Sequence, residues 1–438
     1  MELKELMKGA GIVGAGGAGF PSYAKLAGGA DTLLINGAEC EPLLYTDYVI
    51  LKRELSLVLS GIDAVRKELS IPRAILAVKA HTAKRLSLTD GECLSEKITV
   101  KVLPDVYPIG DEISLIFEAT GRVVRPGNLP ITKGVIIYNV ETMYNLGASI
   151  RLGTPVTMKW LTLGGDIDSP CVVRVPVGTR ISDLFARFNI AVGEGRVVIE
   201  GGPSMGQIIN PETASVKKTT KGILVLPEGI QASQSKKMNE KMAVARAETA
   251  CCQCTRCTDM CPRHLLGYPL EPHKMVRTAM GAVTVSPEMV ISATLCCSCG
   301  VCESLACSQG ISPRAVINNY KALLAKNKMR YSGKEDVFPS FEREYRKIPS
   351  DKWASTLGVK RFDTVCDFGG EISDFARVEI SLSQSIGAPS VPCVSDGDLV
   401  SSGDLIAESA EGLSLPIHAS IPGRVTLGTG KIIIEKVR

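Results

Sequence analysis

Ten of the 15 cysteines in this 438-residue chain lie in two short runs. The first run, CCQCTRCTDMCPRH, has the spacing C-x2-C-x2-C-x3-C followed by a proline, at Cys251, Cys254, Cys257 and Cys261. The second run, CCSCGVCESLACSQG, repeats this spacing with one extra residue before the last thiol, at Cys296, Cys299, Cys302 and Cys307. Thiolates at this spacing hold a [4Fe-4S] cluster. The runs therefore predict one-electron transfer.

Two such runs predict two clusters, with the fourth cysteine of each run crossing to the other cluster, as in ferredoxins. We assign one cluster to Cys251, Cys254, Cys257 and Cys307, and the other to Cys296, Cys299, Cys302 and Cys261. Zinc sites use separated pairs of ligands, and disulfides need an oxidising compartment, so both alternatives fit less well. Cys252 and Cys297 double the first thiol of each run and are expected to be bystanders.

Composition places the chain among globular proteins of two to four domains. The net charge of +4 and the aromatic content of 5% give no indication of nucleic-acid binding. The start, MELKELMKGAG, has no apolar core of a signal peptide, and no apolar run is long enough to span a membrane. We expect a cytoplasmic protein.

A glycine-rich segment near the start, GAGGAGFPSYAKL, contains Gly14-x-Gly16-x-x-Gly19. A Rossmann turn follows a buried strand, whereas MELKELMK is polar with apolar residues at helical spacing. The expected order is helix, glycine loop, helix from Pro21, then a strand over 31–36. Backbone N–H groups of such a loop can bind a phosphate, and Lys25 adds a positive charge.

Four segments in this order resemble the FMN-binding segments of the NADH-oxidising flavin subunit of complex I and of the Rnf complex C subunit. They are GAGGAGFPSYAKL, NGAECEP, YPIGDE at 107–112, and NVET at 139–142 after an apolar strand over 134–138. The resemblance implies an FMN-binding domain that oxidises NADH.

The resemblance also implies roles for individual residues. The glycine loop, with Gly14, Gly16, Gly17 and Gly19, and Lys25 are expected at the FMN phosphate. The ribityl chain and ring are expected among Asn36, Glu39, Gly110, Asp111, Glu112, Asn139 and Thr142, and the nicotinamide nucleotide at Phe20 and Glu41. Ala15 and Ala38 stand where complex I has an arginine and an aspartate.

The remaining chain divides by pattern into further modules. Short apolar runs with Gly and Pro turns and a helix over 181–188 resemble the soluble-ligand-binding β-grasp (SLBB) domain of this family, in which we expect a scaffolding role. Helices are expected over 238–250 and from Ser312-Pro313 to Lys326, around the cluster runs. Six lysines (Lys217, Lys218, Lys221, Lys236, Lys237 and Lys241) are interpreted as a solvated linker and helix face.

The C-terminal segment from about residue 361 has short strands separated by glycine turns and resembles the barrel-sandwich hybrid of biotinyl and lipoyl carriers. The matching region, HASIPG at 418–423, has no lysine to carry a swinging arm. The expected fold is multidomain α/β and α+β. Its expected parts are an FMN/NADH-binding α/β domain (1–150), an SLBB β-grasp domain (151–232), a ferredoxin-like helical dicluster domain (233–330), a linker (331–360) and a barrel-sandwich hybrid (361–438).

This domain order resembles the cobalamin (corrinoid) reductases of propanediol-utilisation microcompartments. The resemblance implies an oxidoreductase that passes electrons from NADH through FMN and two [4Fe-4S] clusters to cobalamin. Expected partners are cobalamin or a corrinoid adenosyltransferase, microcompartment shell proteins, and further copies of the chain in a homo-oligomer. A base-off corrinoid motif is missing, since Pro262 stands where D-x-H-x-x-G needs its aspartate before His264. The alternatives are a Rnf-like subunit that donates to a protein partner, and a microcompartment scaffold.

Overall fold

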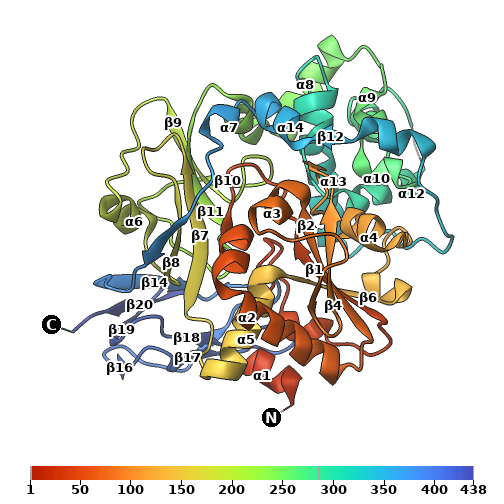
Figure 1. The fold of residues 1–438 in the computed structure, drawn as a ribbon. Helices are drawn as coiled ribbons and strands as arrows, with labels where there is room; N and C mark the ends of the chain where they lie inside the picture. Colours follow the sequence, from red (N-terminus) through yellow and green to blue (C-terminus); the bar gives the residue numbers. More distant parts are fainter. Residues whose placement is uncertain (1, 285, 438) are drawn as a thin grey trace.

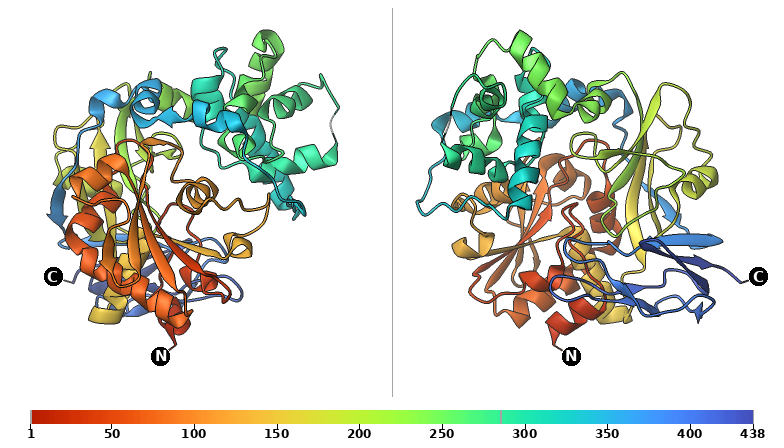
Figure 2. Two further views of the ribbon diagram at one scale, coloured as in Figure 1. Left: turned by 45° about the vertical axis from the view of Figure 1, so that its right-hand side comes forward. Right: turned by 180° about the vertical axis from the view of Figure 1, so that it is seen from behind.

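The computed structural model describes residues 2–284 and 286–437. The chain forms four units, three of which pack around a central α/β domain (Figure 1). The flavin domain, residues 2–152, lies in the lower centre of Figure 1, with the β-grasp domain on one side and the helical cysteine domain above it. The β-rich C-terminal domain packs beneath, near both termini, as the view from behind in Figure 2 also shows. None of the described helices is long and apolar enough to cross a membrane.

The flavin domain is built on a five-stranded sheet of order β3-β4-β2-β1-β6. Its strands are β1 (Thr32–Gly37), β2 (Arg73–Lys79), β3 (Cys93–Ser95), β4 (Ile98–Leu103) and β6 (Val135–Asn139). All neighbours pair in parallel except β3 with β4, so the carboxyl ends of β1, β2, β4 and β6 share one edge. Ligands of open α/β sheets collect at such an edge.

Two long helices cover one face of this sheet, α2 (Thr46–Glu68) and α5 (Val140–Leu152). They cross closely because each has a glycine at the contact. A Cβ on Gly61 would lie 2.1 Å from the Met143 carbonyl oxygen, and one on Gly147 would lie 1.9 Å from that of Leu57. The close crossing holds the start of α5 against the carboxyl edge of the sheet.

The start of the chain follows the expected order with one difference. Helix α1 (Leu3–Gly9) precedes the glycine loop, and β1 follows it. The segment after Pro21 is a short 3-10 turn, Ser22–Lys25, and no longer helix develops there. The reason is local: Val13 and Pro21 form a β-bridge that folds the loop back on itself.

The β-grasp domain has a six-stranded sheet of order β10-β9-β11-β7-β8-β13, with helix α6 (Ile181–Arg187) packed on it. Its strands are β7 (Met158–Gly165), β8 (Cys171–Pro176), β9 (Arg196–Glu200), β10 (Gln207–Ile209), β11 (Gly222–Pro227) and β13 (Phe368–Glu371). Strand β13 lies beyond the expected domain boundary at residue 361. It joins the β-grasp sheet because it pairs with the open edge of β8. Phe368 also packs on Trp160, with ring centroids 5.1 Å apart.

The cysteine domain consists of short helices around the two cysteine runs: α8 (Glu240–Ala250), α9 (Arg256–Asp259), α10 (Pro262–Leu265), α11 (Pro272–Ala279), α12 (Pro287–Ile291) and α13 (Pro313–Lys326). Helix α13 begins where the sequence predicts, since the Ser312 hydroxyl accepts a hydrogen bond from the Ala315 N–H at 3.1 Å.

The expected linker over 331–360 is in part a packed element. Strand β12 (Ile348–Pro349) pairs with β5 (Val106–Tyr107) of the flavin domain, and α14 (Ser350–Leu357) follows. Trp353 of α14 is fully buried, which gives this segment an apolar anchor that a solvated linker lacks.

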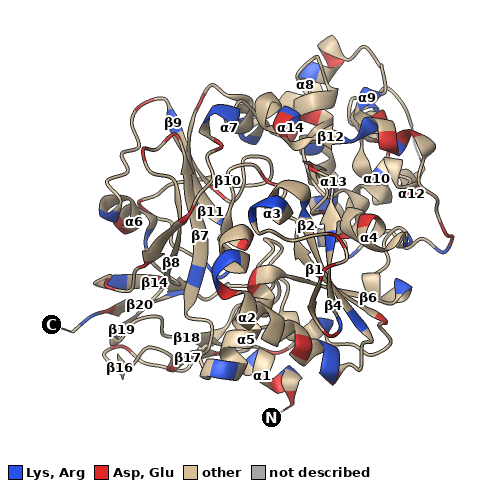
Figure 3. Ribbon diagram, in the orientation of Figure 1, with Lys and Arg blue, Asp and Glu red and all other residues tan. Residues whose placement is uncertain are grey.

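The C-terminal domain is all β, as expected, with sheets of order β14-β20-β19-β16 and β15-β17-β18. Its strands are β14 (Arg377–Ser381), β15 (Val391–Pro392), β16 (Leu399–Val400), β17 (Leu405–Glu408), β18 (Ile417–His418), β19 (Gly423–Gly428) and β20 (Lys431–Glu435). Acidic and basic residues are interspersed over all four units (Figure 3).

Candidate functional site

The candidate flavin cradle lies at the carboxyl edge of the flavin-domain sheet. Asn36 at the end of β1 lies opposite Asn139 at the end of β6. The Asn139 side-chain amide donates to the Asn36 carbonyl at 3.2 Å and to Asp47 Oδ2 at 2.8 Å. The Asn36 amide donates to the Gly110 carbonyl at 2.9 Å. Three segments that are distant in sequence therefore meet at this edge.

The glycine loop lies against the start of α5. Its Ala15 N–H donates to the Thr142 hydroxyl at 3.1 Å, and its Gly14 N–H donates to the Phe20 carbonyl at 2.8 Å. Gly17 has a φ of +99°, and a Cβ added there would meet no atom within 4 Å. The loop thus has an open side with bare backbone next to a helix N-terminus, which is suited to a phosphate.

Lys25 lies between the glycine loop and the YPIGDE turn. Its ammonium is 3.2 Å from Glu112 Oε1 and donates to the Ile137 carbonyl at 3.2 Å. Its side chain is 31% exposed, so an anion can reach the ammonium. Together with the open glycine loop, this cation fits the phosphate of FMN.

Two acidic residues of the NGAECEP segment are held in different ways. Glu39 accepts from the Thr46 hydroxyl at 3.1 Å and the Asp47 N–H at 3.2 Å. Burial, and then the negative charge of Asp47, raise the pKa of Glu39 to about 7. Glu41 accepts from the backbone N–H groups of Ser204 (2.8 Å) and Met205 (2.9 Å) of the β-grasp domain.

Two lysines that we expected in solvent, Lys218 and Lys221, are buried. Lys221 contacts Asp47 and lies 3.7 Å from Glu39, and it is only 7% exposed. Burial opposes the charge of Lys221, but Asp47 and Glu39 outweigh it and raise its pKa. Lys218, 2% exposed, donates to the Gly11 carbonyl at 2.8 Å. The solvated-linker interpretation is wrong for both residues, because each finds its partner in the flavin domain.

Lys159 and Glu141 form another buried ion pair that the sequence did not predict. Their charged groups are 2.5 Å apart, and each side chain is 1% exposed. Lys159 is on β7 and Glu141 is in the first turn of α5, so this ion pair also joins the two domains. The one signal in the sequence was the position of Lys159 inside an otherwise apolar strand.

The structure brings the eight expected cysteines together in two groups. The outer cysteine site is a cavity lined by Cys251, Cys254, Cys257 and Cys307. The inner cysteine site is a cavity lined by Cys261, Cys296, Cys299 and Cys302. Each group draws its members from both runs, as the crossed assignment requires. Cys252 lines the outer cavity and Cys297 the inner one.

These cavities fit clusters better than single ions. Within residues 2–284 and 286–437, no three His, Cys, Asp or Glu side chains converge closely enough to hold one metal ion. Four thiols placed around a cavity are the donor set of a [4Fe-4S] cubane.

The inner cysteine site contacts the YPIGDE turn of the cradle. The Tyr107 hydroxyl donates to the Cys299 carbonyl at 2.7 Å, and its ring stacks on Trp353 at 4.4 Å. Arg263, two residues after Cys261, pairs with Asp111 at 2.7 Å, and both side chains are 12% exposed. Burial opposes the charge of Arg263, but Asp111 outweighs it and raises the pKa of the guanidinium.

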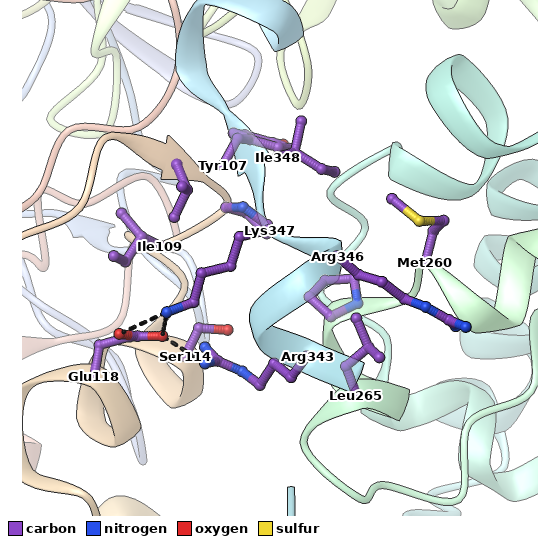
Figure 4. Close-up of a pocket in the computed structure, with 13 residues that line it drawn as sticks. Tyr107, Ile109, Ser114, Glu118, Met260, Leu265, Arg343, Arg346, Lys347 and Ile348 are labelled. Atoms are coloured by element: carbon purple, nitrogen blue, oxygen red, sulfur yellow. Dashed lines mark hydrogen bonds and ion pairs between the residues drawn. The ribbon is translucent and has the colours of Figure 1, made fainter. Parts of the chain in front are cut away.

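A pocket beside this contact is lined by β5, α4 (Glu112–Thr120), the first-run residues Met260 and Pro262, and the segment 343–348 (Figure 4). Three cationic side chains line this pocket. Arg343 lies 2.6 Å and Lys347 3.2 Å from Glu118, and Arg346 donates to the Asp259 carbonyl at 2.7 Å. Since these cations already have partners, the pocket is best described as a joint between the flavin and cysteine domains.

Comparison with protein families identifies three domains along the chain. Residues 7–148 match the Nuo51 FMN-binding domain, residues 250–312 a 4Fe-4S dicluster domain, and residues 371–430 the RnfC barrel sandwich hybrid domain. These matches confirm the expected fold classes, in the expected order. They also agree with FMN and [4Fe-4S] clusters as the cofactors.

Relatives align with parts or nearly all of the chain. The C subunit of the proton-translocating ferredoxin:NAD(+) oxidoreductase complex of Clostridium ljungdahlii is 32% identical over 60% of this chain and 56% of its own length. Cobalamin reductase PduS of Salmonella typhimurium is 36% identical over 97% of this chain and 94% of its own length. PduS of Citrobacter freundii gives the same values. This chain therefore belongs to the PduS family of oxidoreductases.

Proposed function

We propose that this chain is a cobalamin reductase that takes its electrons from NADH. The observation that carries the proposal is that one chain, similar to the PduS proteins over nearly its full length, holds two four-cysteine sites, one of which contacts the flavin cradle. When bound, FMN accepts an electron pair and releases single electrons, which iron–sulfur clusters carry.

The residues of the cradle divide into binding roles. We assign the phosphate of FMN to Lys25 and the loop Gly14, Gly16, Gly17 and Gly19, whose backbone is open on one side. We assign the ribityl chain and ring to Asn36, Glu39, Gly110, Asp111, Glu112, Asn139 and Thr142. The hydrogen bonds from Asn139 and Asn36 fix the end of each strand, so these residues position the cofactor without having to rearrange.

Nucleotide binding is assigned to Phe20 and Glu41, on the rim of the cradle. Phe20 closes the glycine loop through its carbonyl, and its ring is half-buried. Glu41 is fixed by two backbone N–H groups of the β-grasp domain. Burial raises the pKa of Glu41, and the hydrogen bonds from Ser204 and the charge of Lys236 oppose this shift.

The eight thiols hold the clusters in the two sites, as thiolates. Packed side chains fill the contact between the inner cysteine site and the cradle. Trp353 and Tyr107 stack and exclude water beside Cys299, and Arg263 neutralises Asp111 at the turn. A dry, fixed contact of this kind favours rapid passage of electrons without reorganisation of the chain.

The proposed physiological partners follow from the family resemblance. We assign the corrinoid product to an adenosyltransferase that rebuilds the coenzyme, and the place of action to a bacterial microcompartment, inside it or attached to its shell proteins.

The test is an anaerobic optical titration of the reconstituted protein. NADH is added first and bleaching of the flavin and cluster absorbance is followed; aquocobalamin is added second. We expect bleaching by NADH, then its reversal with the spectrum of cob(II)alamin. Bleaching that cobalamin does not reverse would contradict the reductase and favour a protein acceptor, as in Rnf-like electron transfer. Lack of any bleaching would contradict NADH as the donor.

A further inference from the structure

The two cysteine sites differ in their access to solvent. In the inner cysteine site Cys261, Cys299 and Cys302 are each at most 8% exposed. In the outer cysteine site Cys254 is exposed, and the other three thiols are half-buried. The whole loop 252–256, which carries Cys254, is exposed on the surface. A molecule in solution can therefore approach the outer site far more closely than the inner one.

The inner site is the one that contacts the flavin domain. The Tyr107–Cys299 hydrogen bond joins the backbone of the second cysteine run to strand β5, at the start of the YPIGDE turn. The Arg263–Asp111 ion pair joins the first run to the end of the same turn. Tyr107, Cys299 and Trp353 also belong to one buried apolar cluster. Two independent contacts thus fix the inner site beside the cradle.

The outer site packs instead on helices of its own domain. Cys251 and Cys307 contact an apolar cluster formed by α8, α11 and the start of α13, with Ala243, Ala247, Val276, Ile311 and Val316 as its buried residues. All the described members of this cluster lie between residues 238 and 320. No flavin-domain residue takes part in it among the described residues.

We propose that the two sites are ordered: the inner cysteine site faces the flavin, and the exposed loop 252–256 at the outer site is the docking surface for the corrinoid. The inference rests on the proposed function. Electron transfer weakens steeply with distance, so donor and acceptor must each come close to a site. The loop presents the exposed polar side chains of Gln253, Thr255 and Arg256. These match the amide groups on the rim of a corrin, which need hydrogen-bond partners more than an apolar pocket.

The first experiment measures the order in the wild-type holoprotein. Samples are frozen within milliseconds of mixing with NADH, with and without a dysprosium chelate, and their EPR power saturation is compared. The chelate relaxes paramagnetic centres that lie near the surface. We expect the cluster signal that forms first to be insensitive to the chelate, and the signal that forms second to require at least threefold more power for half-saturation. The reverse order, or equal sensitivity of both signals, would overturn the proposal.

A dithionite-reduced sample separates this inference from the proposed function. Dithionite reduces the clusters without NADH, and the two signals must still differ in their response to the chelate. If NADH fails to reduce the protein but this difference persists, the donor is wrong and the inner and outer positions stand. If the difference is absent with dithionite, the inferred positions are wrong whatever the donor.

The second experiment tests the docking surface with Arg256→Ala. Arg151→Ala is the matched control, because Arg151 is an exposed arginine on α5 of the flavin domain. We expect Arg256→Ala to raise the aquocobalamin concentration needed for half-maximal reoxidation by at least threefold, and Arg151→Ala to leave it unchanged. Equal behaviour of both variants with free cobalamin would overturn the assignment of the loop and favour a protein that carries the corrinoid. Slower bleaching by NADH in Arg256→Ala would also overturn it, since the loop would then act before the acceptor.

Discussion

The flavin domain meets its two large neighbours through contacts that differ in character, because one is mainly ionic and the other combines ion pairs with stacked aromatic rings. Against the β-grasp domain it forms an ionic seam, made of Glu39, Asp47, Glu141, Lys159 and Lys221, all buried or nearly so. Against the cysteine domain and its connector it forms a packed seam, made of Tyr107, Asp111, Arg263, Cys299 and Trp353. Each seam contains one of the two tryptophans of the chain, Trp160 beside Lys159 and Trp353 on Tyr107.

The difference shows what each seam contributes to the site. Buried charges are stable only when paired, so the ionic seam sets the charge around the cradle and depends on every partner being present. Stacked aromatic rings and apolar contacts tolerate the loss of one polar atom more easily, so the packed seam chiefly sets distance. Removal of one group at a time from each seam tests this contrast.

Lys159→Met is expected to have the largest effect. The substitution keeps the length of the side chain but leaves the Glu141 carboxylate buried and unpaired. Breaking a buried ion pair in this way costs about 3–5 kcal/mol. The measurement is the urea midpoint of unfolding, followed by tryptophan fluorescence.

Lys52→Met is the matched control for this substitution. Lys52 pairs with Asp367 at 2.7 Å, but the two side chains are 48% and 74% exposed. Exposed ion pairs contribute about 0–1 kcal/mol, so we expect little change in the midpoint. Equal effects of the two substitutions would contradict the description of this seam as dependent on buried pairs.

The raised pKa of Glu39, a residue of the ionic seam, predicts that the free energy of unfolding depends on pH. Its pKa is raised from 4.5 to about 7, so between these values the folded protein binds more protons than the unfolded chain. Its contribution to stability is therefore complete below pH 4.5 and is lost as the pH rises through 7, by less than about 3 kcal/mol. The groups that face Glu39 are Asp47, Lys221 and Thr46.

Glu39→Gln is the variant that checks this prediction. The free energy of unfolding is measured at pH 5 and pH 8 for both proteins. We expect a smaller loss of stability between the two pH values in Glu39→Gln than in the wild type. The same loss in both would assign the pH dependence to another group.

Arg263→Leu tests the ion pair of the packed seam. Asp111 would keep its hydrogen bond from the Ser114 N–H at 3.2 Å but would lose its cation. A hydrogen bond to a charged group contributes about 1.5–3 kcal/mol, and Asp111 is partly reached by solvent, so we expect a loss of about 2 kcal/mol. The measurement is the urea midpoint of unfolding, followed by tryptophan fluorescence.

Arg263→Lys is the control for this substitution, because it keeps the positive charge. We expect it to recover at least half of the lost stability. A similar loss in both variants would show that packing of the guanidinium on the ring of Tyr268, 5.5 Å away, matters more than its charge.

Much of this fold is predictable because the signals are local in sequence. The Ser312-Pro313 start of α13, the strand before Asn139 and the cysteine spacing are each contained within about ten residues of chain. The grouping of cysteines into an inner and an outer site also follows from their spacing, because the crossed fourth ligand is a property of the paired runs.

The remaining features depend on partners far away in the sequence. Lys221 resembles a solvated lysine until Asp47, 174 residues earlier, is placed against it. The segment 331–360 lacks a strong pattern of its own, and Trp353 stacks on Tyr107, a residue far away in the sequence. Strand β13 is short and rich in glycine, and it forms because β8 offers an open edge. Local patterns carry no information on such partners.

Tyr107→Phe is expected to have the smallest effect on stability and the most specific one on the packed seam. The substitution keeps the ring stacked on Trp353 at 4.4 Å and removes only the hydroxyl that donates to the Cys299 carbonyl. Loss of one neutral hydrogen bond costs about 1 kcal/mol. Because this seam mainly sets distance, the EPR spectrum of the inner cluster should change little and flavin binding should not change. Tyr107→Leu, which also removes the ring, is the comparison, and we expect it to lose clearly more stability. If Tyr107→Phe were as destabilising as Tyr107→Leu, the hydroxyl rather than the stacked ring would hold the cradle to the inner cysteine site, and both seams would depend on single polar contacts.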